Sequence, residues 1–192
     1  MSRGAAPQGS AARGSGARGG AVALFPPLDA TVDEIRAALA PLRNDFSVAV
    51  YNCQNAFAVG AIIRVAHSFL AREIIVIGRE PYYQKASMAM EKYETIVPVD
   101  DEAAFYTHVA GRPVWAIEKD HARVAITAVT EFPRDVVLLF GSERAGLPMS
   151  LIERADEVVG IPMYGVNHSF PVTVAAGIAM HEWARRRYQP SR

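Results

Sequence analysis

Three separate points of the sequence carry side chains that could act on a ligand. They are an arginine, Arg64, a turn of sequence GSE at residues 141–143, and a polar run of sequence NHS at residues 167–169. A guanidinium binds phosphate and stabilises negative charge, but its pKa above about 12 makes it a poor base. Imidazole titrates near neutral pH, so His168 is a chemically plausible proton acceptor. Each point also has an ordinary structural reading, as a solvated arginine, an acid that supports a turn, or a helix cap.

The segments that must position these side chains alternate between short β-branched runs and helical patterns. This order is typical of an α/β fold in which a mostly parallel sheet carries helices on both faces. We expect strands, most of them near-continuous apolar runs, at residues 46–51, 73–77, 95–99, 113–117, 135–140 and 157–161. We expect helices from Thr31, where Glu34 completes a capping box, and at residues 59–70, 86–92, 101–110, 148–155 and 171–187.

The carboxyl ends of the strands are where a ligand is expected. In open α/β sheets the ligand lies beyond these ends, so the loops after Phe140 and Ile161 are the candidate binding loops. Arg64 falls off the apolar stripe of its predicted helix, beside Gly60 and Ser68, and must face something polar. The glycine-rich motifs that cradle dinucleotides or nucleoside triphosphates are missing from the sequence.

Composition bounds the class of protein. The 192 residues are 51% hydrophobic and 21% charged, which predicts one soluble globular domain with a tail. Residues 1–25, rich in Gly, Ala, Ser and Arg, should be a disordered tail, either inert or in loose contact with phosphates, and residues 26–192 should fold. The 20 basic and 20 acidic residues cancel, which is weak evidence either way because nucleic-acid binding depends on local patches.

Cysteine and histidine usage gives a further expectation. The single cysteine, Cys53, excludes an internal disulfide, and the five histidines lack zinc-binding spacing. We therefore expect a reducing compartment, the cytoplasm, and no metal. The apolar run at residues 172–180 is shorter than the roughly 20 residues that cross a bilayer, so we expect no membrane span.

Three longer segments carry a family resemblance. They read NAFAVGAIIRVAHSF at residues 55–69, VVLLFGSERAGLP at residues 136–148 and IPMYGVNHSFPVTVAAGIAMHE at residues 161–182. In this order they resemble the motifs of the SpoU (TrmH) class of RNA ribose 2′-O-methyltransferases, which belong to the SPOUT superfamily. The resemblance covers nearly everything after residue 46.

The resemblance implies a fold, a cofactor and partners. The C-terminal segment would thread through a chain loop to form a trefoil knot, a rare exception to the rule that chains are unknotted. The small residues at positions 174–179 would let the last helix pass close to neighbouring backbone. The methyl donor would be S-adenosylmethionine, the acceptor a ribose hydroxyl of tRNA or, less favoured, of rRNA, and the protein a homodimer with a composite active site.

The resemblance also implies roles for individual residues. Arg64 would be the catalytic arginine, which we expect to stabilise the developing alkoxide, and Gly60 would leave room for a ribose-phosphate. The residues implied for the cofactor are Ile117, Gly141, Glu143, Ile161, Met163, Ser169 and Pro171. Those implied for RNA are Asn55, Arg64, Arg144 and His168, with His168 also the alternative proton acceptor.

Two departures from the family pattern concern amides. The family commonly has asparagine where this sequence has Ala58 and Pro171, and Asn55 and Asn167 are the nearby candidates to replace them. The departures leave open a non-catalytic RNA-binding protein on the same scaffold. Arg185, Arg186 and Arg187 could either stabilise the end of the last helix or contact RNA.

Overall fold

The computed structural model describes residues 27, 29–78, 83–142 and 144–187. The predicted disordered tail, residues 1–25, lies outside the described residues. The boundary between tail and domain therefore stays a prediction.

The strands of the described chain form one parallel sheet. In chain order they are β1 (Phe46–Tyr51), β2 (Ile74–Ile77), β3 (Ile96–Val99), β4 (Val114–Ile117), β5 (Val124–Ala125), β6 (Val136–Phe140) and β7 (Glu157–Gly160). Their order across the sheet is β3-β2-β1-β6-β4-β7-β5, and each neighbouring pair is parallel. The strand β6 lies between β1 and β4, and β7 lies between β4 and β5. The carboxyl ends of β6, β4 and β7 are therefore neighbours.

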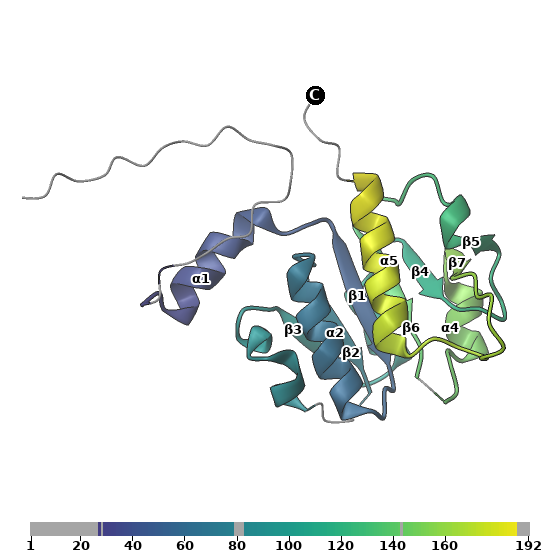
Figure 1. Cartoon of the computed structure of the whole chain (residues 1–192), viewed down its shortest axis with the longest axis horizontal. Helices are drawn as coiled ribbons and strands as arrows, with labels where there is room; N and C mark the ends of the chain where they lie inside the picture. Colours follow the sequence, from purple (N-terminus) through teal and green to yellow (C-terminus); the bar gives the residue numbers. More distant parts are fainter. Residues whose placement is uncertain (1–26, 28, 79–82, 143, 188–192) are drawn as a thin grey trace, which may run out of the picture.

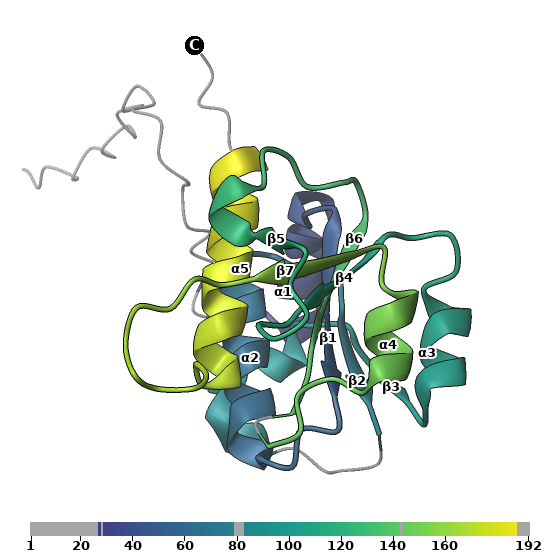
Figure 2. The ribbon, with the colours of Figure 1, turned by 90° about the vertical axis from the view of Figure 1, so that its right-hand side faces the viewer.

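Helices cover both faces of this sheet. They are α1 (Val32–Leu39), α2 (Ala56–Ser68), α3 (Glu102–His108), α4 (Met149–Arg154) and α5 (Val172–Arg187), with the short 3₁₀ helices η1 (Ala40–Leu42), η2 (Gln84–Ser87), η3 (Met90–Lys92) and η4 (Ile126–Ala128). Figure 1 shows α2 and α5 side by side in front of the sheet, and Figure 2 shows α3 and α4 on the opposite face. The predicted α/β architecture is confirmed, whereas the threading of α5 through a chain loop stays a prediction.

Successive side chains of a strand point to opposite faces of the sheet, and this divides the apolar core into two layers. On β1, Phe46, Val48 and Val50 belong to the cluster beneath α2 and α5, whereas Ala49 belongs to the cluster beneath α3 and α4. Burial of a large apolar side chain is worth about 1.5–3 kcal/mol relative to exposure. All six predicted strands are found, and their ends agree with the predicted ends within one residue. They could be predicted because strands buried on both faces are apolar throughout. The two-residue strand β5 was too short to predict.

The predicted helix at residues 86–92 is wrong. Met88 and Ala89 have φ angles of 54° and 67°, in the left-handed region, and they separate η2 from η3. This segment packs tightly on α2, because a Cβ on Gly60 would lie 2.7 Å from the Tyr83 carbonyl oxygen and 2.7 Å from the Ala86 Cβ. The space beside Gly60 is therefore filled by the chain itself, and the room predicted there for a ribose-phosphate is taken up by residues 83–87.

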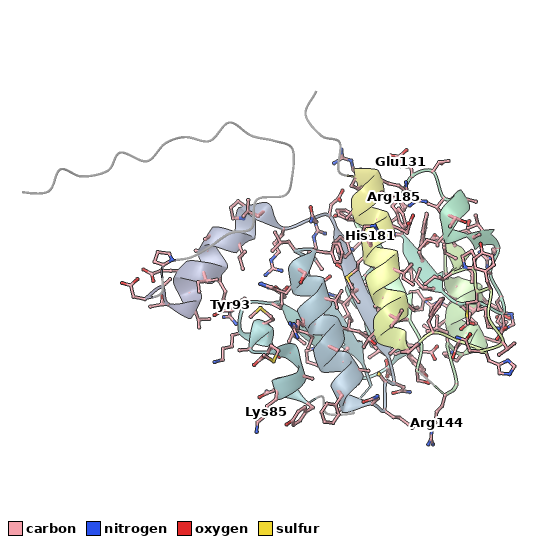
Figure 3. All side chains as sticks on the ribbon, in the orientation of Figure 1. Lys85, Tyr93, Glu131, Arg144, His181 and Arg185 are labelled. Carbon is pink, nitrogen blue, oxygen red and sulfur yellow. The ribbon has the colours of Figure 1, made fainter. Side chains whose placement is uncertain are left out.

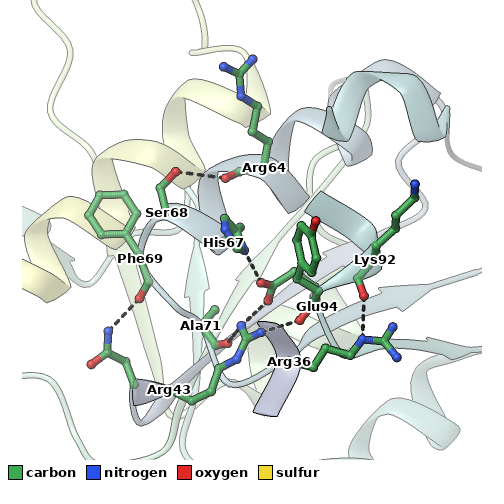
Figure 4. A network of polar contacts seen from close by, with 11 residues as sticks. Arg36, Arg43, Arg64, His67, Ser68, Phe69, Ala71, Lys92 and Glu94 are labelled. Carbon is green, nitrogen blue, oxygen red and sulfur yellow. Dashed lines mark hydrogen bonds and ion pairs between the residues drawn. The ribbon is translucent and has the colours of Figure 1, made fainter. Parts of the chain in front are cut away.

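Two polar networks hold the amino ends of the strands. In the first, the buried Glu94 carboxylate accepts hydrogen bonds from Arg43 and lies 2.7 Å from His67 Nδ1, and Arg43 also donates to the carbonyls of Ala71 and Tyr93 (Figure 4). These contacts join the three segments that precede β1, β2 and β3 to one another and to the last turn of α2.

The second network centres on Glu73, just before β2. Its carboxylate lies 2.9 Å from His108 Nε2 and 2.5 Å from an Arg112 nitrogen, and Arg112 also donates to the buried Ser47 hydroxyl. Burial raises the pKa of Glu73, but the hydrogen bonds from Arg112 and His108 outweigh it and hold that pKa below its usual value. The carboxylate is thus favoured in its ionised form beside the Arg112 guanidinium.

The end of α5 is fixed by two of its three arginines. Arg186 donates to the carbonyls of Val129 and Ile126, the latter at 2.8 Å, and pairs with Glu182. Arg187 donates to the Phe132 carbonyl at 3.0 Å. These contacts attach the end of α5 to residues 126–132, whereas Arg185 is exposed and pairs with Glu182, so the choice between helix stabilisation and RNA contact stays open.

Candidate active site

A cleft of about 360 Å³ opens at the carboxyl ends of β4, β6 and β7. Its volume lies within the roughly 300–1,000 Å³ that is typical of small-molecule sites. The three loops that follow these strands form its walls, with the start of α5 closing one side. Its lining residues are Ile117, Glu118, Lys119, Asp120, His121, Phe140, Gly141, Ser142, Arg144, Ala145, Gly146, Leu147, Ile161, Met163, His168, Ser169, Phe170, Val172 and Ala175.

The loop after β6 is a tight turn that only glycine permits. The amides and carbonyls of Ser142 and Gly146 bond to each other at 3.0 and 3.1 Å. A Cβ on Gly141 would lie 2.2 Å from the Gly146 carbonyl carbon, so a larger residue would force the turn open. Gly146 has a φ of +64°, and a Cβ there would come within 3.0 Å of the Glu118 carboxylate. The cleft is thus lined by backbone at this wall.

The loop after β4 supplies charge. The Glu118 carboxylate accepts hydrogen bonds from the backbone amides of Lys119 and Asp120, at 2.7 and 3.1 Å. The hydrogen bond from Lys119 holds the pKa of Asp120 below its usual value, and the charges of Lys119, His121 and His168 act in the same direction. His168, from the loop after β7, lines the same cleft as Asp120.

The loop after β7 leads into α5. The Asn167 amide donates to the Ser169 carbonyl at 3.4 Å, and the Pro171 carbonyl accepts from the amides of Val174 and Ala175 at 2.9 and 3.0 Å. The amide of Asn167 is thus engaged within its own loop. The first turn of α5 then contributes Val172 and Ala175 to the cleft.

Most residues expected at the cofactor meet in this cleft. Five of them line it, namely Ile117, Gly141, Ile161, Met163 and Ser169. Pro171 does not line it and is exposed, although its neighbours Phe170 and Val172 do. The ring carries no polar group, and its carbonyl begins α5. Glu143 lies outside the described residues.

The residues expected to contact RNA divide into two groups. Arg144 and His168 line the cleft, and Figure 3 shows Arg144 extending outward from the tip of its loop. Asn55 and Arg64 do not line the cleft of their own chain. The Asn55 side chain caps α2 by accepting from the amides of Phe57 and Ala58 at 3.1 and 3.4 Å. It is therefore engaged as a cap and does not replace the amide missing at Ala58, which is buried.

Arg64 is exposed on the outer face of α2. Figure 4 shows its side chain extending away from the network around Glu94, while its backbone carbonyl accepts a hydrogen bond from Ser68 at 3.2 Å. Among the described residues, no acidic side chain forms an ion pair with this guanidinium. Arg64 is thus available to a group from outside its own chain.

The charged residues after β4 escaped the sequence-based prediction. Glu118, Lys119, Asp120 and His121 follow a strand end, so the rule that ligands lie beyond the carboxyl ends of strands could have found them. The order β6-β4-β7 was needed to know that this loop meets the other two. In the described part of the chain, no cluster of potential metal ligands is present and no helix has the length and apolarity to cross a membrane.

Comparison with known proteins decides the family. A family model described as the SpoU rRNA Methylase family matches residues 45–181, which include all the cleft residues. The chain belongs to the SpoU rRNA methylase family. Its motifs at residues 55–69, 136–148 and 161–182 all lie within the match or overlap it.

Several SpoU relatives are named methyltransferases. RlmB of Coxiella burnetii, a 23S rRNA (guanosine-2′-O-)-methyltransferase, is 26% identical over 138 residues, which are 69% of this chain and 55% of that protein. The tRNA (guanosine(18)-2′-O)-methyltransferase of Aquifex aeolicus is 39% identical over 57 residues, 30% of this chain and 27% of that protein. The AdoMet-bound rRNA methyltransferase of Sinorhizobium meliloti is a structural neighbour with a TM-score of 0.70 and 27% identity, covering 81% of this chain and 61% of that one. The chain spans about half the length of the first curated relatives that it matches.

Proposed function

We propose that this SpoU protein is an S-adenosylmethionine-dependent RNA methyltransferase that acts on a ribose 2′-hydroxyl of tRNA or rRNA. The observation that carries the proposal is the cleft at the ends of β4, β6 and β7, which gathers residues from the second and third family motifs. Relatives are named as 2′-O-methyltransferases of both RNA classes, and a structural neighbour was solved with AdoMet bound. Sequence reasoning favours tRNA.

The chemistry of the lining fits this cofactor. Ile117, Ile161 and Met163 offer an apolar wall to an adenine, while the close backbone of Gly141 and Gly146 leaves room for the ligand to approach. The Glu118 and Asp120 carboxylates complement a ligand that carries an ammonium and a sulfonium. When bound, S-adenosylmethionine supplies an activated methyl group. The task of the protein is to position the hydroxyl and to stabilise the negative charge that develops on it.

We propose that Arg64 acts in a homodimer, on the cleft of the partner subunit. Phe57, Ala61 and Arg64 recur at helical spacing on α2, and the exposed Phe57 marks this face as apolar at one end. Val174 of the neighbouring α5 is 43% exposed. Pairing of these helices in two copies would cover the apolar side chains and bring Arg64 to a second chain.

A mixed-dimer experiment tests this arrangement. Arg64→Ala removes the guanidinium, and Ser169→Trp fills the cleft with a bulky ring, so each homodimer should be inactive. If Arg64 acts across the dimer, random reassembly of the two variants restores about a quarter of the wild-type rate, because half of the dimers carry one intact site. Absence of any recovery from dimers shown to be mixed would place Arg64 and its cleft in the same chain.

Three further expectations belong to the proposal. We propose that residues 26–192 form the methyltransferase domain, that α5 threads through a chain loop in a trefoil knot, and that the protein acts in the cytoplasm. The single, buried Cys53 suits a reducing compartment. The knot is supported by family membership.

The rival function is a non-catalytic RNA-binding protein. It is favoured by the bonds that Asn55 and Asn167 already make to neighbouring backbone, since the family asparagines at Ala58 and Pro171 are otherwise without a replacement. Calorimetry with S-adenosylmethionine separates the two. Binding at micromolar concentration supports the enzyme, and a folded protein that binds RNA without binding the cofactor supports the rival.

Methylation mapping tests the activity itself. Ribose 2′-O-methylation of tRNA and rRNA would be mapped in cells with and without the protein, and in cells that carry Ser169→Trp. The proposal expects one or a few sites that disappear in both altered strains. An identical methylation map in all three strains would contradict it.

A further inference from the structure

We propose that Glu118 binds S-adenosylmethionine by accepting hydrogen bonds from the hydroxyl groups of the cofactor's ribose. The inference rests on the proposed function and adds a residue that none of the three family motifs contains. Glu118 is the first residue after β4 and lines the cleft. Its role is to hold and orient the cofactor, since these hydroxyls neither form nor break bonds in the methyl transfer.

The backbone of Glu118 is fixed at the edge of the sheet. Its amide donates to the Val159 carbonyl of β7 at 3.1 Å, which extends the pairing of β4 with β7 by one residue. The loop that follows packs closely on β7, because a Cβ on Gly160 would lie 2.7 Å from the Ala122 Cβ. Side chains held by rigid elements orient a ligand better than those on free loops. Glu118 has such a support.

The two oxygens of the Glu118 carboxylate have different surroundings. Oε1 accepts hydrogen bonds from the backbone amides of Lys119 and Asp120, at 2.7 and 3.1 Å. Oε2 lies 3.0 Å from the point that a Cβ on Gly146 would occupy, and Gly146 lines the same cleft. Within the described chain no group donates to Oε2. An ionised carboxylate accepts at both oxygens, so one oxygen fixes the side chain and the other is open to a ligand.

The position of this open oxygen favours the ribose over the other polar groups of the cofactor. Ile117, immediately before Glu118, and Ile161, just after the neighbouring strand β7, belong to the apolar wall offered to the adenine. The ribose is bonded directly to the adenine, whereas the ammonium is at the far end of the methionine chain. In dinucleotide-binding α/β folds, an acid that follows a parallel strand accepts a hydrogen bond from a ribose hydroxyl in this way.

Asp120, the other acidic side chain in the described lining, is a weaker candidate. Its carboxylate pairs with Lys119 and is 69% exposed. An exposed ion pair gives a carboxylate little fixed orientation. Glu118 is half-buried and is held by two backbone amides.

The first test measures how the side chain and the hydroxyls depend on each other. Calorimetry gives the affinity of the full chain for S-adenosylhomocysteine, for its 2′,3′-dideoxy form, and for the form with hydrogen in place of the amino group. Glu118→Gln should weaken the binding of the parent compound and of the form without the amino group by about tenfold or more, because a charge-assisted hydrogen bond is lost. It should change the binding of the dideoxy form by less than about twofold.

Glutamine also separates binding from a purely structural role. Its amide oxygen can still accept from the amides of Lys119 and Asp120, so the urea midpoint of Glu118→Gln should match that of the wild type. If Glu118 only fixed its own loop, this variant would keep the wild-type affinity for every ligand.

Two control variants isolate the effect of charge. Glu157→Gln makes the same substitution at a carboxylate that also accepts a backbone amide, from Val158 at 2.9 Å, but that lies at the amino end of β7 outside the cleft. It should leave all affinities within about twofold of the wild type. Asp120→Asn removes a charge from the same loop as Glu118. It should act alike on the parent and dideoxy forms, which carry the same charges.

A second test uses ligands without any cation. Adenosine contains neither the sulfonium nor the ammonium, so a loss of adenosine affinity in Glu118→Gln must come from neutral donors. The loss should be present for adenosine and absent for 2′,3′-dideoxyadenosine. An equal loss for both nucleosides would assign the carboxylate to the 6-amino group of the adenine and overturn the inference.

The outcomes separate this inference from the proposed function. If the wild type binds S-adenosylhomocysteine and Glu118→Gln weakens the parent and dideoxy forms equally, or weakens neither, the ribose assignment is wrong and the proposed function stands. A loss that disappears only for the form without the amino group would assign Glu118 to the ammonium, with the same consequence. A folded wild-type protein that binds neither S-adenosylmethionine nor S-adenosylhomocysteine overturns both.

Discussion

Val65 Cγ1 on α2 lies 4.0 Å from the point that a Cβ on Gly177 of α5 would occupy. The two helices of the first and third motifs therefore meet through a side chain at this point, and among the described residues no atom outside α5 lies nearer. Sequence reasoning expected the small residues at positions 174–179 to admit neighbouring backbone, and at Gly177 this is wrong. The tight backbone approach occurs at Gly60 instead.

Gly177→Ala should stabilise the monomeric fold. A methyl group at this position makes an ordinary contact with Val65, and alanine in a helix interior is favoured over glycine by about 0.5–1 kcal/mol. Urea unfolding monitored by circular dichroism gives the change. Destabilisation of the isolated chain would mean that α5 packs closer to α2 than the structure has it.

Gly60→Ala should have the opposite effect. The added Cβ would meet the Tyr83 carbonyl and Ala86 at 2.7 Å, so residues 83–87 must shift, at a cost of about 1–3 kcal/mol. The same unfolding experiment serves as the measurement, and Gly177→Ala is the matched control for a glycine in a neighbouring helix. Equal stabilities of the two variants would contradict the close packing of η2 on α2.

Glu73→Gln should destabilise the protein by roughly 3 kcal/mol at pH 7, because it leaves Arg112 partly buried without its carboxylate. The pKa of Glu73 is lower in the folded protein than its usual value of 4.5. Its contribution is therefore complete above about pH 5 and is lost as the pH falls through the folded-state value. The difference between wild type and variant should shrink below about pH 4 in urea titrations at several pH values. A difference that stays constant down to pH 3 would refute this role.

Gly141→Ala should weaken the binding of S-adenosylmethionine by about tenfold or more, since the new Cβ would collide with the Gly146 carbonyl and open the turn. Calorimetry measures the affinity. Gly111→Ala is the control, because Gly111 also has a positive φ, +78°, but a Cβ there would have no neighbour within 4 Å. Gly111 lies before β4, at the amino end of the strands and away from the cleft. An unchanged affinity in Gly141→Ala would remove this turn from the cofactor site.

Arg186→Lys should lower stability by about 2 kcal/mol, although the charge is kept. A lysine cannot donate at once to the carbonyls of Ile126 and Val129 and to Glu182 as the guanidinium does. Arg185→Lys, at an exposed position on the same turn, should change stability by less than about 0.5 kcal/mol. Thermal unfolding measures the stability of the two variants, and equal midpoints would show that the contacts of Arg186 contribute little to it.

The sequence by itself determined the elements whose signals are local. Strands buried on both faces must be apolar throughout, so β1 and β6 are visible as continuous runs such as FSVAVY and VVLLF. The capping box of Thr31 and Glu34 fixes the start of α1 in the same way, because its partners are three residues apart. The motif loops could likewise be recognised, since each is contiguous.

Only the tertiary structure decided how distant segments meet. The position of β4 between β6 and β7 brings the charged loop after Ile117 into the same cleft as His168, and no local pattern encodes that proximity. The backbone of η2 beside Gly60, and the carbonyls that hold Arg186, also belong to segments far away in the chain. A residue's own type and spacing limit which groups it can bind, but packing of non-local segments determines which of those groups lies within reach.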